Sequence, residues 1–140
     1  MERDTVDLLR ELDLCTDFHT FYDEHESDML DHSLSELLAD LLEKKNLKKT
    51  QVIRQSELSE VYAYQIFSGL RVPDRKKLLC IAVAMQLTVA ETQTLLRYAG
   101  YPTLYIRFVE DAVVLFGLSK HLSVIQINEL LYEFGLETIG

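Results

Sequence analysis

Apolar residues recur along most of the chain three or four positions apart, which is the spacing of a helix face rather than the alternation of a strand. The clearest example is a series of leucines on one face: Leu34, Leu37, Leu38, Leu41 and Leu42. Ser33 and Glu36 have the spacing of a capping box at its start, and Asn46 follows it as a candidate left-handed terminator. The pattern predicts a helix that begins after Ser33 and ends before Asn46.

Two shorter helices are predicted before this one, in a strongly acidic stretch. The first covers about Thr5–Leu14, and the second covers about Thr16–His25 with Thr16 as its N-cap. The polar residues Asp23–His32 are predicted to form a linker. We therefore expect residues 1–32 to form an acidic helical leader.

Two further short helices are predicted after the leucines, at about Lys49–Ser56 and Ser59–Ser68. Gly69 is expected to end the second of them, and Pro73 is expected to begin the next helix within its first turn. Because the chain has only five glycines and two prolines and shows no strand-like alternation, it is predicted to be all-α.

The second half of the chain repeats at an interval of 35 residues, since residues 78–104 align with residues 113–139. Both copies have a capping box before a helix and a glycine after it: Thr88, Glu91 and Gly100 in the first, Ser123, Gln126 and Gly135 in the second. Each copy is predicted to be a helix, a capped turn and a second helix. Two copies are too few for a solenoid, so we expect a stacked helical pair.

The formal charge of −9 is unevenly distributed. Residues 1–43 hold 14 acidic residues and two basic ones, whereas residues 44–77 hold nine basic residues and only three acidic ones. A local excess of positive charge is the electrostatic footprint of a phosphate-binding surface. The same distribution is compatible with a solvated helical surface that carries ordinary salt bridges, and charge alone does not separate these interpretations.

Two short helices joined by a tight turn, with Ser59 as the cap of the second, are typical of a helix-turn-helix. The segment Leu47–Gly69, LKKTQVIRQSELSEVYAYQIFSG, resembles the DNA-binding domain of lambda-repressor/Cro-like, or Xre-like, regulators. The small core residues of that family are matched by Val52, Leu58, Ala63 and Ile66. A group with an N-terminal leader and a C-terminal helical extension is also similar through the stretches YAYQIFSG, P-x-R-x-K-L, ETQ-x-LL-x-YAGYP and INELLYEFG.

This resemblance covers most of the chain and is strongest from about Leu34 to Gly100. It implies an all-α protein with a lambda-repressor-like helix-turn-helix domain at residues 33–100, after the leader at 1–32 and before a C-terminal helical hairpin at 101–140. It also implies a transcriptional regulator that binds double-stranded DNA sequence-specifically and reads the major groove with helix 59–68. The alternative is that the same scaffold serves as a protein–protein interaction module without direct DNA binding.

The resemblance assigns roles to individual side chains. Residues on the outer face of helix 59–68 would meet base edges, and polar residues around that helix would contact phosphate. By residue type, Gln65 can pair with adenine, while Glu60 can only accept from cytosine N4. The candidate base-reading residues are Glu60, Val61, Tyr62 and Gln65, and the candidate cap and backbone-contacting residues are Ser59, Lys48, Lys49, Ser68, Arg71 and Arg75.

Two acidic residues depart from the family pattern. Glu57 stands in the turn, where the family prefers glycine because φ is positive, and a non-glycine residue there costs on the order of 1 kcal/mol. Glu60 places negative charge on the face that should approach DNA. Both carboxylates are also compatible with a structural role, since a helix N-terminus favours negative charge. Phe67 is expected to be a core residue.

The run Val113–Leu118 is apolar around its whole circumference, so either the chain's own helices or a second copy must cover it. Because a single helix-turn-helix contacts few base pairs, we expect a homodimer, formed through the C-terminal helices, that reads two half-sites. The acidic leader allows two interpretations. It could lie against the basic residues and compete with DNA, or it could be a solvated segment that favours solubility.

The remaining chemistry predicts neither an enzyme nor a cofactor. The sequence has no glycine-rich phosphate loop and no nucleophile elbow, and Cys15 with His19 lacks a third, orienting group. His19, His25 and His32 lie among carboxylates without a metal-ligand spacing, so no metal is expected. Cys15 and Cys80 are expected to be reduced thiols. No apolar run approaches roughly 18 residues and no signal peptide is recognisable, which predicts a cytoplasmic protein without a membrane span.

Overall fold

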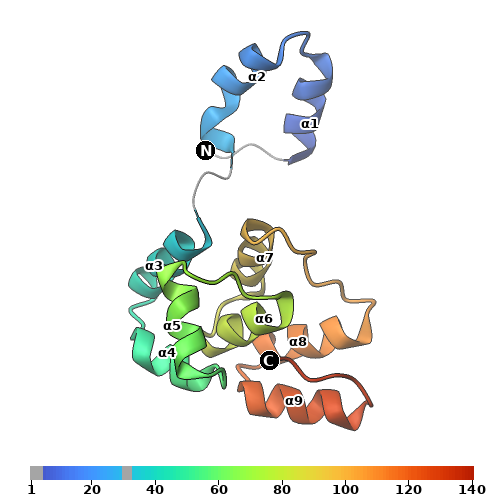
Figure 1. The fold of residues 1–140 in the computed structure, drawn as a ribbon. Coiled ribbons are helices and arrows are strands. Elements are labelled where there is room, and N and C mark those ends of the chain that lie inside the picture. The colour runs from blue at the N-terminus through green and yellow to red at the C-terminus, as the bar shows by residue number, and fades with distance from the viewer. Residues whose placement is uncertain (1–4, 30–32) are drawn as a thin grey trace. The chain divides into compact units, whose positions relative to one another are not determined.

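The computed structural model describes residues 5–29 and 33–140 (Figure 1). Every regular element within these ranges is a helix, which confirms the all-α prediction. No helix in the described ranges is long and apolar enough to cross a membrane. The chain divides into two units, Met1–Asp31 and His32–Gly140, and each is considered by itself.

The first unit contains α1 (Thr5–Leu14), α2 (Phe18–His25) and the short 3-10 helix η1 (Glu26–Asp28). The start of α1 and the end of α2 agree with the sequence pattern. The carboxylate of Asp17 caps α2 by accepting a hydrogen bond from a backbone N–H two residues later, at 3.3 Å. The expectation that Thr16 caps this helix is therefore wrong, because the neighbouring carboxylate takes that position.

A buried histidine joins the elements of the first unit. His25 Nε2 lies 2.6 Å from the Glu11 carboxylate on α1, and its Nδ1 lies 3.3 Å from the Asp28 carboxylate in η1. These contacts give the polar stretch from Asp23 to Asp28 a helical structure, so the linker prediction is wrong there. The last part of that prediction, residues 30–32 with His32, lies outside the described residues.

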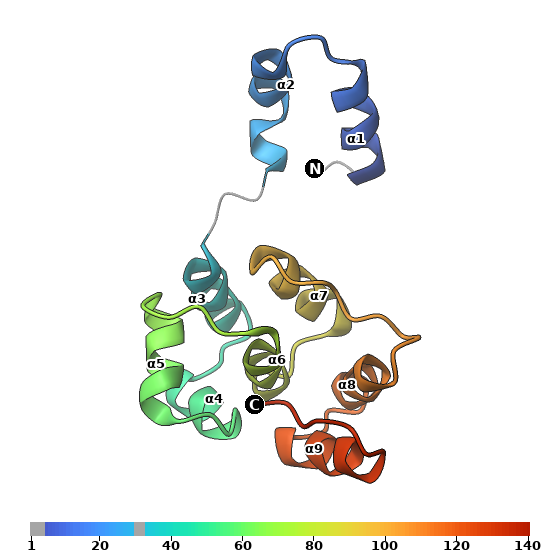
Figure 2. The same ribbon diagram turned by 45° about the vertical axis from the view of Figure 1, so that its right-hand side comes forward.

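The second unit contains seven helices within its described residues: α3 (Leu34–Lys44), α4 (Lys49–Gln55), α5 (Glu60–Ser68), α6 (Arg75–Ala84), α7 (Val89–Tyr98), α8 (Val109–Ser119) and α9 (Val124–Glu133). Figures 1 and 2 show α6 in the middle of the other six. Every residue of α6 from Leu78 onward is buried, which is why its sequence is apolar on all sides. Asp74 caps α6, so Pro73 lies before the helix and the prediction that it begins the helix is wrong.

Four turns of the second unit have the same form, in which a left-handed residue is followed by a leucine and then by the N-cap of the next helix. The turns are Asn46-Leu47-Lys48, Glu57-Leu58-Ser59, Gln86-Leu87-Thr88 and His121-Leu122-Ser123, with φ of 54°, 63°, 53° and 57° at the first residues. Both predicted capping boxes of the repeat, before α7 and before α9, are complete. These short signals determine where the helices begin and end.

The repeat predicted from the sequence is also present in three dimensions. Helices α6 and α7 stack on α8 and α9, with α7 against α8 and α6 against α9. The side-chain amides of Gln93 and Asn128, 35 residues apart, each exchange two hydrogen bonds with the backbone of a residue eleven positions later, Leu104 and Ile139 respectively. The prediction of a stacked helical pair is therefore confirmed.

Helices α3 and α4 extend this stack by one more pair. Helix α4 packs on α6 and α3 packs on α7, which is the pattern that the next two pairs repeat. Helix α5 lies between the first and second pairs in the sequence only, and in space it packs against α3 and α4. One continuous apolar core runs through all of these helices, from Leu38 to Ile139. This core fixes the position of α5 from within.

Candidate functional site

The turn between α4 and α5 is held by a buried hydroxyl. The Ser56 side chain is fully buried, donates to the carbonyl of Ile53 at 2.6 Å and accepts from the N–H of Leu58 at 3.3 Å. Glu57 between them has a φ of 63°, so the positive φ predicted for this position is confirmed. Ser59 then caps α5 by accepting from the N–H of Tyr62 at 3.3 Å. The two helices are thus joined at a fixed angle.

The inner face of α5 belongs to the core. Ala63, Ile66 and Phe67 are buried, which confirms the expectation for Phe67. The opposite side of the first turn is open to solvent, with Glu60 exposed and the Val61 side chain 70% exposed. Of the candidate base-reading residues, Glu60 and Val61 therefore face outward, whereas Tyr62 and Gln65 are half-buried and Tyr62 packs against the core.

Two lysines cover the tyrosines of α5. The ammonium of Lys49, at the start of α4, lies 5.8 Å from the ring centre of Tyr64, and that of Lys77, on α6, lies 5.9 Å from the ring centre of Tyr62. Such cation–π contacts are worth about 0.5–1 kcal/mol at exposed sites. They keep two positive charges beside α5.

The Asp74 carboxylate is the ion-pair partner of Lys77. The backbone N–H of Lys77, followed by its ammonium, holds the pKa of Asp74 below its usual value, although partial burial opposes the shift. The same carboxylate raises the pKa of Lys77. Both groups are therefore charged near neutral pH.

The end of α5 is closed by Gly69, whose φ is 86°. The chain turns back, and the N–H groups of Leu70 and Arg71 both donate to the carbonyl of Gln65, at 2.9 and 3.2 Å. The hydroxyl of Ser68 donates to the same carbonyl at 3.1 Å. The side chains also meet, since Arg71 Nε donates to Gln65 Oε1 at 3.0 Å. Ser68, Gln65 and Arg71 thus lie together at the end of α5.

The nine basic residues of the segment 44–77 fall into two groups. Four of them form ion pairs: Lys45 with Glu91, Arg75 with Asp111, Lys76 with Glu137 and Lys77 with Asp74. Within the described residues, the other five are exposed and have no ion-pair partner: Lys44, Lys48, Lys49, Arg54 and Arg71. The sequence left open a phosphate-binding surface or ordinary salt bridges. The salt bridges are present for the paired group, whereas a phosphate-binding role for the exposed, unpaired group stays a prediction.

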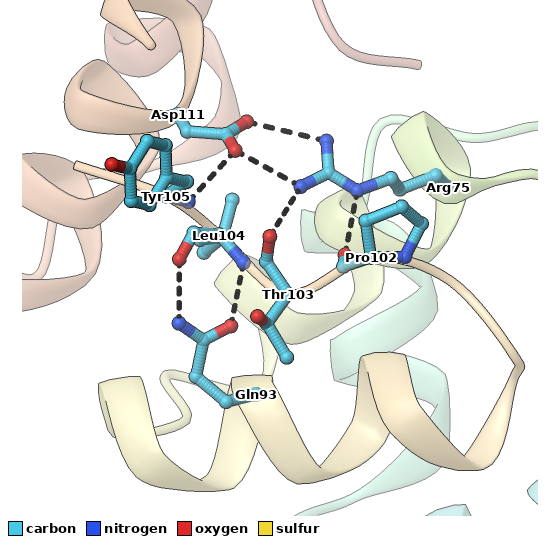
Figure 3. Close-up of polar contacts among 7 residues, drawn as sticks. All are labelled: Arg75, Gln93, Pro102, Thr103, Leu104, Tyr105 and Asp111. Carbon is cyan, nitrogen blue, oxygen red and sulfur yellow. Dashed lines mark hydrogen bonds and ion pairs between the residues drawn. The ribbon is translucent and has the colours of Figure 1, made fainter. Parts of the chain in front are cut away.

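Arg75 is the candidate residue whose side chain is engaged elsewhere (Figure 3). Its guanidinium donates to both oxygens of Asp111, at 3.2 and 3.1 Å, and to the carbonyls of Pro102 and Thr103, at 3.0 and 3.3 Å. Asp111 is 4% exposed and also accepts from the N–H of Tyr105 at 2.9 Å. Arg75 therefore anchors the connection between α7 and α8. The sequence signal for this partner was a pair of acidic residues, Glu110 and Asp111, at the start of an otherwise apolar helix, and the pattern does not distinguish between them.

Two surface hollows flank the α4–α5 turn. One, of about 290 Å³, is lined by residues of α4 and α5: Thr50, Ile53, Arg54, Leu58, Glu60 and Tyr64. The other, of about 680 Å³, lies between Glu57 and the outer face of α9, where Ile125 and Tyr132 are exposed. The carboxylates of Glu57 and Glu60 thus give both hollows an acidic edge.

Potential metal ligands and thiols are the other chemical groups of the described residues. No group of three or more histidine, cysteine or acidic side chains in the described ranges has the geometry of a metal site. Cys15 and Cys80 are free thiols, and burial raises the pKa of the Cys80 thiol to about 12. Comparison with protein-family models, curated proteins and solved structures finds no match for the chain.

Proposed function

We propose that the protein is a sequence-specific, double-stranded-DNA-binding transcriptional regulator with a lambda-repressor-like helix-turn-helix domain, which inserts the first turn of α5 into the major groove. The observation that carries this proposal is the outward-facing first turn of α5, capped by Ser59 and flanked by unpaired basic side chains. A helix fits the major groove, and its N-terminal residues reach base edges there. Glu60 and Val61, the first two residues of α5, would then lie closest to the base edges.

Lys48, Lys49 and Arg71 are the side chains that we propose to bind phosphate. They are exposed, and no ion pair within the described residues neutralises them. Arg75 is left out of this set because it holds Asp111. The acidic character of the chain as a whole does not oppose such contacts, since the Debye length is about 8 Å at physiological ionic strength and distant carboxylates are screened.

We further propose that two copies associate with each other through their C-terminal helices and together bind one operator. The chain's own helices bury Val113, Val114 and Leu118, but Phe116 is 51% exposed, and Tyr132 on α9 is 80% exposed. A second copy that covers these exposed apolar side chains would present two α5 helices to two half-sites. Sedimentation at micromolar concentration tests this step, and a monomer would refute it.

A protein-interaction module is the second candidate function, and a specific observation favours it. Glu57 and Glu60 add negative charge at the start of α5, and apolar side chains are largely exposed at both ends of this helix: Val61 at 70% near its start, and Leu70 at 78% and Val72 at 74% after its end. Acidic and apolar groups together suit a protein partner better than a phosphate backbone.

Selection of bound fragments from a pool of random DNA duplexes distinguishes the two functions. A DNA-binding regulator enriches a defined sequence, and the logarithm of its affinity falls with the logarithm of salt concentration by about 0.9 for each phosphate contact. Three contacts per copy predict a slope of about −2.7 for each half-site. An interaction module retains no duplex, even at low salt.

A further inference from the structure

The base preference of Gln65 depends on what its side-chain amide already binds. A free glutamine amide offers a donor and an acceptor side by side, which is the arrangement that matches N6 and N7 of adenine. In this protein the acceptor is occupied, since Gln65 Oε1 receives the Nε–H of Arg71 at 3.0 Å. The base preference expected from residue type alone, adenine, must therefore be reconsidered from the geometry of the Gln65–Arg71 pair.

The contact follows from the local backbone rather than from a chance rotamer. Gly69 reverses the chain with a φ of 86°, and a Cβ at this position would lie 3.1 Å from the Ser35 hydroxyl oxygen. The N–H groups of Leu70 and Arg71 are then bound to the Gln65 carbonyl. Backbone hydrogen bonds thus place residue 71 over residue 65 before their side chains interact.

The pair presents mainly hydrogen-bond donors to an approaching base. Gln65 keeps the two N–H donors of its amide nitrogen, and Arg71 keeps the donors of its two terminal nitrogens. The amide oxygen retains a second lone pair, but the exocyclic amino group of adenine would meet the positively charged guanidinium there. Guanine offers two acceptors, N7 and O6, in the major groove and no donor at these positions.

We propose that Gln65 and Arg71 act as one unit that selects guanine, rather than adenine, at the base pair facing the second turn of α5. Arg71 is then a specificity-determining residue and not simply a phosphate contact. This inference rests on the proposed DNA-binding function and names the base that the same site reads.

The test is a selection from random duplexes with the full-length parent and three variants. The parent enriches guanine at one position of each half-site. Arg71→Ala frees the amide oxygen and enriches adenine at that position, whereas Gln65→Ala loses the preference. Lys48→Ala is the matched control, because it removes an exposed positive charge that makes no contact with Gln65; it binds more weakly but keeps the guanine.

Direct binding to the enriched duplex supplies the magnitude and a readout that needs no variant. Replacing the selected guanine by adenine weakens parent binding by about tenfold to a hundredfold, which corresponds to one bidentate base contact. Replacing it by 7-deazaguanine, which lacks the N7 acceptor, weakens the parent but not Gln65→Ala.

Two outcomes would overturn the inference, and they differ in what they leave standing. If the parent enriches a sequence but reads adenine at this position, or is indifferent to 7-deazaguanine, the Gln65–Arg71 unit does not select guanine, and DNA binding stands. If the parent enriches no sequence and retains no duplex in low salt, the proposed function itself fails.

Discussion

Replacing Arg75 by alanine removes the partner of a buried carboxylate, and the structure sets the size of the effect. Two guanidinium N–H groups bind the Asp111 oxygens at 3.2 and 3.1 Å, and Asp111 is only 4% exposed, so the carboxylate has little contact with water. Breaking a buried ion pair by removing one member costs about 3–5 kcal/mol. We expect about 3 kcal/mol for Arg75→Ala, because the Tyr105 N–H still binds the carboxylate.

Urea denaturation, followed by circular dichroism, measures this loss in a double-mutant cycle. Arg75→Ala and Asp111→Ala each lower the free energy of unfolding, and the double variant loses about 2 kcal/mol less than the sum of the single changes. Arg97→Ala, at an exposed position of α7, is the control and changes the free energy of unfolding little.

The cycle also separates two roles of Arg75. If Arg75→Ala lost less than about 1 kcal/mol and showed no coupling to Asp111, the guanidinium would not be an internal anchor. Arg75 would then be available for phosphate, as the resemblance to Xre-like regulators implies. A large coupling energy instead places it in the scaffold that carries α8.

Three further predictions concern other positions. Glu57→Gly should stabilise the fold by about 0.5 kcal/mol in thermal denaturation by relieving a positive φ, and Glu57→Ala should not; equal effects would contradict this. Gly117→Ala should cost about 1–3 kcal/mol, because its Cβ would lie 2.4 Å from two carbons of buried Ile127, and Ile127→Val should restore part of the loss. Burial raises the pKa of Glu91, but the Thr88 N–H and the Lys45 ammonium outweigh it and lower the pKa below 4.5. Glu91→Gln should therefore unfold more readily than the parent at pH 7, and this difference should disappear as the pH falls from 4.5 through the lowered pKa; a constant difference would contradict it.

The helices could be predicted because their ends are encoded locally. Ser33, Ser59, Thr88 and Ser123 each cap a helix with an oxygen that binds an N–H three residues later, and such signals are readable without knowledge of the fold. The misassigned cap at α2 has a local cause as well. Two capable residues are adjacent there, and nothing in the pattern favours the carboxylate of Asp17 over Thr16.

The candidate site was harder to predict because side-chain partners are set by tertiary structure. Arg75 binds the carboxylate of Asp111, which is 36 residues away on α8. Because α8 is apolar on all sides beyond its first turn, its sequence pattern does not indicate which way the side chains of that first turn point. Gln65 is a different case, since its partner is only six residues away but depends on the reversal at Gly69. The residue types indicated which side chains are candidates for DNA contact, whereas their hydrogen-bond partners determine which of these side chains are available.

Charge reversal on the α4–α5 face tests the central claim most directly. The triple variant Lys48→Glu, Lys49→Glu and Arg71→Glu is compared with a control triple that changes the formal charge equally at exposed positions elsewhere, Arg97→Glu, Arg107→Glu and Lys120→Glu. Fluorescence anisotropy of the enriched duplex is measured at low salt, with circular dichroism to confirm folding. We predict that the first triple abolishes binding, while the control stays within about threefold of the parent because its charges are remote and screened. Equal affinities for the two triple variants would contradict it.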